Sequence, residues 1–139
     1  TIKTFSYYIS NIARDKEIIT QVRHIDILPT ILEQLKIKID SDFESIDGIS
    51  LLPLIRGELF KEKIAYTETA NPLHEKAPPK EPNTKSVRTS EWKLIVNEYN
   101  NSMELYNLDN DPQELENLIG KSFPIEMKLK LELNKLQKK

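Results

Sequence analysis

The spacing of hydrophobic positions changes along the chain and predicts short helices followed by strands. Between residues 26 and 35 the apolar side chains recur at helical intervals, which predicts a helix with one apolar face. Asp26 precedes this run as the predicted N-cap. Residues 50–57 repeat the pattern, with Ser50 as the cap and Gly57 as the left-handed residue that ends a second, shorter helix.

In the second half of the chain the pattern changes to alternation with a period of two, which is typical of strands. Residues 63–69 alternate β-branched or aromatic side chains with polar ones and predict a strand. Residues 92–97 predict another, and an asparagine-rich turn leads to a return strand over 103–108. The sequence therefore predicts an antiparallel hairpin in this region.

Local capping signals predict two more helices towards the C-terminus. Asp111, Pro112 and Glu114 form an N-cap, a proline at the first helical position and a capping-box acid, which predict a short helix over 111–120. Ser122 opens a final helix, whose apolar stripe is formed by Ile125, Leu129, Leu133 and Leu136. Residues 70–85 hold four of the chain's eight prolines and predict a long loop.

Composition excludes several classes of function. The chain has 139 residues and a net charge of −2, from 20 basic and 22 acidic side chains. It therefore lacks the basic face that sequence-independent nucleic-acid binding requires. No apolar run approaches the ~18 residues of a membrane helix, so no membrane partner is expected. Cysteine is absent, which excludes a disulfide, a thiolate metal site and a cysteine nucleophile within these residues and leaves the cellular compartment open.

Candidate chemistry within the chain is sparse. The two histidines, His24 and His74, have no neighbouring partners at catalytic or metal-ligand spacing. The acidic runs at 40–44 and 109–111 lack the glycine and the final glutamate of a calcium loop. No glycine-rich phosphate loop or serine nucleophile motif occurs either. The residues alone thus indicate no catalytic set and no metal site.

Four segments, taken in this order, resemble the C-terminal portion of sulfatases of the alkaline-phosphatase-like superfamily. They are VRHIDILPTIL (22–32), DGISLLPLIRG (47–57), SVRTSEWKLI (86–95) and ELYNLDNDPQELENL (104–118). The resemblance implies an α/β fold, α+β for this segment in isolation. Residues 1–60 would close the large α/β domain, and residues 61–139 would form a subdomain with a small antiparallel sheet and a packed C-terminal helix.

The resemblance also implies a longer parent enzyme that hydrolyses sulfate esters. Sulfatases use a formylglycine nucleophile and a divalent cation, usually calcium. In the family these motifs precede the equivalent of Val22, so no catalytic or metal-binding residue is assigned to this chain. The implied partner is a sulfated small molecule or a glycan. Two other hypotheses remain: a phosphate- or phosphonate-ester hydrolase or transferase of the same superfamily, and a non-catalytic binding module.

In the family the C-terminal subdomain lies beside the active-site cleft, which implies three candidates on the substrate side: Glu68, His74 and Arg88. For Arg88 the alternative is a structural salt bridge, and for His74 it is an exposed position in the proline-rich loop. The helices before residue 57 resemble elements that cover a sheet lying mostly outside this chain, so we expect the isolated chain to form homo-oligomers. The identities of the substrate and the nucleophile stay open.

Overall fold

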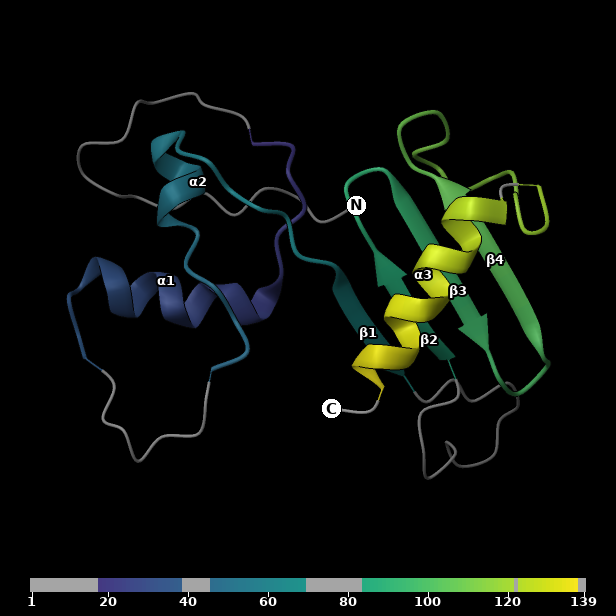
Figure 1. The fold of residues 1–139 in the computed structure, drawn as a ribbon, viewed down its shortest axis with the longest axis horizontal. Helices are drawn as coiled ribbons and strands as arrows, with labels where there is room; N and C mark the ends of the chain where they lie inside the picture. The colour runs from purple at the N-terminus through teal and green to yellow at the C-terminus, as the bar shows by residue number, and fades with distance from the viewer. Residues whose placement is uncertain (1–17, 39–45, 70–83, 122, 138–139) are drawn as a thin grey trace. The chain divides into compact units, whose positions relative to one another are not determined.

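A computed structural model describes residues 18–38, 46–69, 84–121 and 123–137 (Figure 1). The chain divides into two compact units, Thr1–Lys61 and Glu62–Lys139. The assignment of the first unit to the end of an α/β domain stays a prediction. In the part of the chain that the structure describes, no helix is long and apolar enough to cross a membrane.

The first unit contains a 3₁₀ helix η1 (His24–Asp26), helix α1 (Ile27–Gln34) and helix α2 (Leu52–Arg56). Asp26 occupies the predicted N-cap position of α1, but its carboxylate makes no bond to an N–H of that helix. It accepts a hydrogen bond from the backbone N–H of Ile49 at 2.9 Å. It also forms an ion pair with Arg23, whose guanidinium nitrogen lies 2.7 Å away. The predicted capping role of Asp26 is therefore wrong, because its buried carboxylate links two separate segments.

Helix α2 ends at the predicted glycine, but it begins one residue later than the predicted cap. Ser50 Oγ accepts the N–H of Leu52 at 3.2 Å, which satisfies a donor of the first turn. Gly57 follows the last turn with φ 78°, in the left-handed region. The prediction for Gly57 is confirmed. The prediction for Ser50 is wrong by one position, because Leu51 is the N-cap of α2 and makes no side-chain capping bond.

Helix α1 has apolar side chains that no described residue buries. Leu28, Ile31 and Leu35 are 53%, 42% and 62% exposed. The helix itself contains no buried residue. The predicted helix thus exists, and three of the apolar positions on its predicted face remain exposed within the described parts of the chain.

The second unit is a four-stranded antiparallel sheet with the order β1-β2-β3-β4. Its strands are β1 (Ala65–Thr69), β2 (Thr84–Arg88), β3 (Trp92–Asn97) and β4 (Ser102–Asn107). The predicted hairpin is confirmed as β3 and β4. Strand β1 begins two residues later than the alternation suggested, and β2 begins at Thr84, inside the span predicted as loop. The rest of that predicted loop, residues 70–83, lies outside the described residues.

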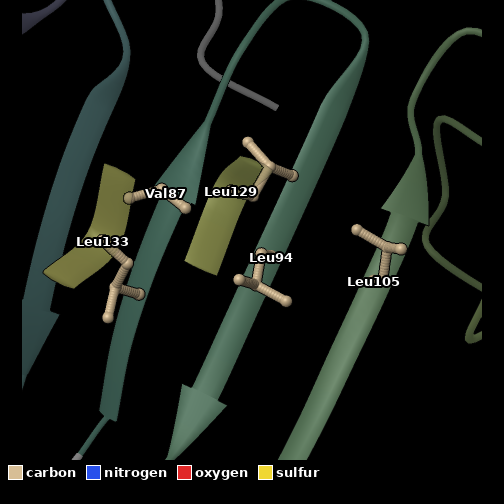
Figure 2. Packing of buried hydrophobic residues seen from close by; sticks show 5 residues of the cluster. All are labelled: Val87, Leu94, Leu105, Leu129 and Leu133. Carbon is tan, nitrogen blue, oxygen red and sulfur yellow. The ribbon is translucent and has the colours of Figure 1, made fainter. Parts of the chain in front are cut away.

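Helix α3 (Phe123–Leu136) covers one face of this sheet (Figure 1). Leu129 and Leu133 of the helix pack with one residue from each of three strands in the buried cluster. Figure 2 shows these side chains: Val87, Leu94, Leu105, Leu129 and Leu133. Ile125 and Leu136 pack against the same cluster, which confirms the predicted stripe. Burial of this apolar surface is the main favourable term for the unit.

The helix predicted over 111–120 is absent; the structure has turns there. The carboxylate of Asp111 accepts the N–H groups of Leu115 and Glu116. Farther along, the Asn117 side chain accepts the Leu105 N–H at 3.0 Å and donates to the carbonyl of Met103 at 3.1 Å. The segment therefore pairs with the outer edge of β4 instead of forming its own helix, because the edge offers unpaired backbone groups.

Candidate functional site

Alternation along the strands gives the sheet a second face, turned away from α3. Val87, Leu94 and Leu105 lie in the buried cluster against α3. Their neighbours along the strands therefore project to the other side. We call this the polar face and define it by Arg88 on β2, Lys93 on β3, and Glu104 and Tyr106 on β4.

Three residues of the polar face form one row across the sheet. Arg88 is the register partner of Lys93, and Lys93 is the register partner of Tyr106. The row thus places two cations side by side on adjacent strands, where like charges repel unless they are neutralised.

Lys93 and Tyr106 each have a carboxylate partner. The ammonium of Lys93 lies 2.6 Å from Glu114 Oε2. The hydroxyl of Tyr106 donates to Glu104 Oε2 at 2.7 Å. That hydrogen bond, helped by burial, raises the pKa of Tyr106 to about 12. Both carboxylates of this region are therefore already engaged by other side chains.

Arg88, the sequence candidate on this face, lacks such a partner. Its Nε is buried and has no hydrogen-bond partner among the residues that the structure describes. Among the described residues no carboxylate forms an ion pair with it, so the structural salt bridge considered as the alternative is not found there. Arg88 is consequently the residue of this face that has unused binding capacity.

Glu68 lies on the opposite face of the sheet from Arg88. Its register partner is Lys85, and it shares the α3 side with Tyr66, whose partner is Val87. Glu68 is exposed and accepts the hydroxyl of Tyr66 at 2.6 Å. Burial, followed by this bond, raises the pKa of Tyr66 to about 12. The structure therefore does not bring Glu68 and Arg88 together, and His74 lies outside the described residues.

The turn after Arg88 is fixed by a residue that the sequence did not suggest. Glu62 accepts the backbone N–H of Ser90 at 2.9 Å and also accepts the Ser90 hydroxyl. Within the turn, Thr89 Oγ1 accepts the N–H of Trp92 at 3.0 Å, and the N–H of Thr89 donates to the Trp92 carbonyl. Glu62 and Ser90 are 28 residues apart, so no local signal could have paired them.

The described residues contain no cluster of ligands for the divalent cation implied by the resemblance. Within the described ranges, no group of three or more His, Cys, Asp or Glu side chains could hold a metal ion. Cysteine, one precursor of formylglycine, is absent from the whole chain. The described residues thus supply no ligand set for the cation, and no catalytic step is derived from either group.

A small antiparallel sheet with a packed C-terminal helix, preceded by short helices, is the architecture of the C-terminal portion of sulfatases. The family described as N-sulphoglucosamine sulphohydrolase, C-terminal, matches residues 4–139. The chain belongs to this family. The resemblance found in the four segments is thereby confirmed.

Solved structures show the same likeness. The protein BT4656, in complex with its substrate D-glucosamine-2-N,6-O-disulfate, is 26% identical with a TM-score of 0.62. BT1596, a 2-O GAG sulfatase, is 28% identical with a TM-score of 0.55. A protein from Bacteroides thetaiotaomicron, solved as a candidate sulfatase, is 28% identical with a TM-score of 0.56. In all three comparisons the match covers 81% of this chain and 23% of the other.

The chain therefore spans less than a quarter of the length of these structures. No curated protein matches it.

Proposed function

We propose that this chain is part of a longer sulfatase that removes sulfate from a sulfated glucosamine. The match of the N-sulphoglucosamine sulphohydrolase C-terminal family to residues 4–139 carries the proposal. The likeness to a protein bound to D-glucosamine-2-N,6-O-disulfate supports the sugar and its sulfation. The likeness to a 2-O GAG sulfatase supports the same substrate class.

The catalytic groups belong to the remainder of the proposed enzyme. Sulfuryl transfer concentrates negative charge on the sulfate oxygens, and a metal ion and cationic donors stabilise such charge. Formylglycine and a divalent cation, usually calcium, are proposed for the part of the enzyme that precedes this segment. Glu68, His74 and Arg88 remain the proposed substrate-side residues of this chain, and Arg88 has the strongest support because of its unpaired Nε.

Sulfate release from D-glucosamine-2-N,6-O-disulfate by the full-length protein tests the proposal. Ion chromatography should detect free sulfate in a reaction that also contains calcium. Product analysis then distinguishes loss of the N-sulfate from loss of the 6-O-sulfate. The 139-residue chain alone serves as the control and should release none, because it contains no catalytic set.

A phosphonate monoester assayed in parallel separates the alternative chemistry. Turnover of the phosphonate ester without sulfate release would contradict the proposal. It would favour a phosphate- or phosphonate-ester hydrolase of the same superfamily. Sulfate release by the isolated chain would also contradict it, because the catalytic groups would then have to lie within these residues.

A further inference from the structure

Arg88 differs from the other basic residues of the sheet. The four strands contain three basic side chains: Lys85, Arg88 and Lys93. Lys85 lies 2.7 Å from Glu98, and Lys93 lies 2.6 Å from Glu114. Arg88 has no such partner among the described residues, and its Nε is a buried donor without an acceptor.

This arrangement leaves one buried donor, the Nε–H of Arg88, unsatisfied among the described residues, and an anion would satisfy it. A guanidinium stays charged at any ordinary pH, so Arg88 cannot relieve its isolation by losing a proton. Buried donors in native proteins are nearly always satisfied, and an exception calls for an explanation. Lys93 lies directly across the strand pair and adds positive potential at the same place.

The neighbouring residues supply no acceptor. Ala65, the register partner of Arg88 on β1, has no polar atom in its side chain. Glu114 already accepts from Lys93, and Glu104 already accepts from Tyr106. An acceptor for Arg88 must therefore come from outside this group of residues.

We propose that Arg88 binds an oxyanion at the polar face, through its Nε–H and a terminal N–H of the guanidinium. The planar fork of arginine matches two oxygens of a sulfate or carboxylate group and is a better fit than a lysine ammonium. Lys93, which is ion-paired with Glu114, adds positive electrostatic potential at the oxyanion and makes no direct contact with it. The assignment of the oxyanion to the sulfate group of a glucosamine rests on the proposed function.

Nuclear magnetic resonance of the intact 139-residue chain tests this directly. The sequence has four arginines, Arg14, Arg23, Arg56 and Arg88, so the Nε–H region of a ¹⁵N spectrum is simple. The probes are D-glucosamine-2-N,6-O-disulfate, sodium sulfate and unsulfated glucosamine, all at constant ionic strength. We expect the Arg88 signal to shift saturably with the sulfated probes and not with glucosamine. Arg56, which is exposed on α2, is the internal control.

The two sulfated probes identify the source of the anion. Saturation by the disulfated sugar at a lower concentration than by sodium sulfate indicates a site for the substrate's sulfate. Saturation by both probes at the same concentration indicates a site for free inorganic sulfate. This result still supports the proposal that Arg88 binds an oxyanion. A shift at Arg88 no larger than that at Arg56 with every probe would overturn the proposal.

Substitutions provide the second readout. Because Arg88→Gln removes the Arg88 Nε–H signal, binding is followed at the backbone amides of residues 88 and 93. This substitution should weaken binding at least about tenfold, the loss expected for a charge-assisted hydrogen bond to an oxyanion. Arg88→Lys should lose part of the affinity, and Arg56→Gln should leave it unchanged. Unaltered amide signals of Leu94 and Leu105 show that the sheet of each variant is folded.

The outcome of this experiment is independent of the test of the proposed function, so the two hypotheses can be rejected separately. If the full-length protein releases sulfate and Arg88 binds none, the inference about Arg88 is wrong and the proposed function stands. If Arg88 binds sulfate and the full-length protein releases none, the inference stands and the proposed function is wrong.

Discussion

The carboxylate of Asp26 accepts the backbone N–H of Ile49 at 2.9 Å, although the two residues are 23 positions apart. A second hydrogen bond joins the same two segments, from the N–H of Leu51 to Thr30 Oγ1 at 2.9 Å. The two bonds join residues 22–32 to residues 47–57, the first two segments of the sulfatase resemblance. The side chains of Asp26 and Thr30 therefore link these two segments of the first unit.

Substitution of Asp26 should destabilise the first unit. Asp26→Asn removes the ion pair with Arg23 and weakens the bond from Ile49, so we expect a loss of about 1–3 kcal/mol. Hydrogen exchange of the Ile49 and Leu51 amides measures the opening free energy. Glu33→Gln, at an exposed position of α1, is the matched control. Equal exchange in the two variants would contradict the assigned role.

The same aspartate predicts a dependence on pH. Burial alone would raise the pKa of Asp26, but hydrogen bonds from Arg23 and Ile49 outweigh it and lower the pKa below the ordinary 3.8. Its contribution to stability is thus present above pH 3.8 and is lost as the pH falls through the folded pKa. We expect the opening free energy at Ile49 to fall in this acid range for the native chain and to change less in Asp26→Asn.

Gly48 should not tolerate a side chain. A Cβ at this position would lie 2.0 Å from the carbonyl oxygen of Ile25, which is backbone and cannot move aside cheaply. Gly48→Ala should therefore cost at least about 1–3 kcal/mol, measured by exchange at Leu51. Gly120→Ala is a contrasting control, because its Cβ meets nothing within 4 Å and only its φ of 77° opposes the change. Native-like exchange in Gly48→Ala would refute the predicted clash.

Asn117 should protect the outer edge of β4. Its side chain accepts the N–H groups of Leu105 and Ile119 and donates to the Met103 carbonyl, so Asn117→Ala removes the side-chain partner of three backbone groups. We expect a loss of about 1–3 kcal/mol in urea unfolding followed by tryptophan fluorescence. Asn110→Ala, in an exposed turn, should change the midpoint little. A similar midpoint for both variants would rule out this role.

Tyr106 and Tyr66 should ionise late, each near 12. Because the bond to Glu104 is the largest cause for Tyr106, Glu104→Gln should lower its pKa clearly. Burial is the largest cause for Tyr66, so Glu68→Gln should have a smaller effect. Absorbance at alkaline pH follows both titrations. Raised phenol pKa values stabilise the fold below pH 10, and this contribution is lost as the pH rises towards 12.

Features that depend on nearby residues were predictable from the sequence. The alternation over 92–108 predicted the β3–β4 hairpin, and Gly57 predicted the end of α2. The helix over 111–120 was wrong because its capping signals are local, whereas Asn117 bonds to the edge of a distant strand. Asp26 was misjudged for the same reason, since its partner Ile49 belongs to another segment.

In the candidate site, too, the features that depend on nearby residues were predictable and those that depend on distant residues were not. Membership of the sulfatase family followed from four short segments, and Arg88 was selected from one of them. Alternation places residues on two faces of each strand, but only the register between β1 and β2 shows that Glu68 and Arg88 lie on opposite faces. The unpaired Nε of Arg88 depends on where every neighbouring acceptor lies, which no sequence pattern contains.

The coding sequence that precedes this segment tests the central claim most directly. A C-terminal part of a sulfatase should follow a reading frame that encodes a cysteine or serine, then x-Pro-x-Arg, together with an early pair of aspartates for the metal. We predict that sequencing the gene upstream of Thr1 finds these residues in frame. A start codon immediately before Thr1, or an unmodified threonine nucleophile motif upstream, would contradict the account.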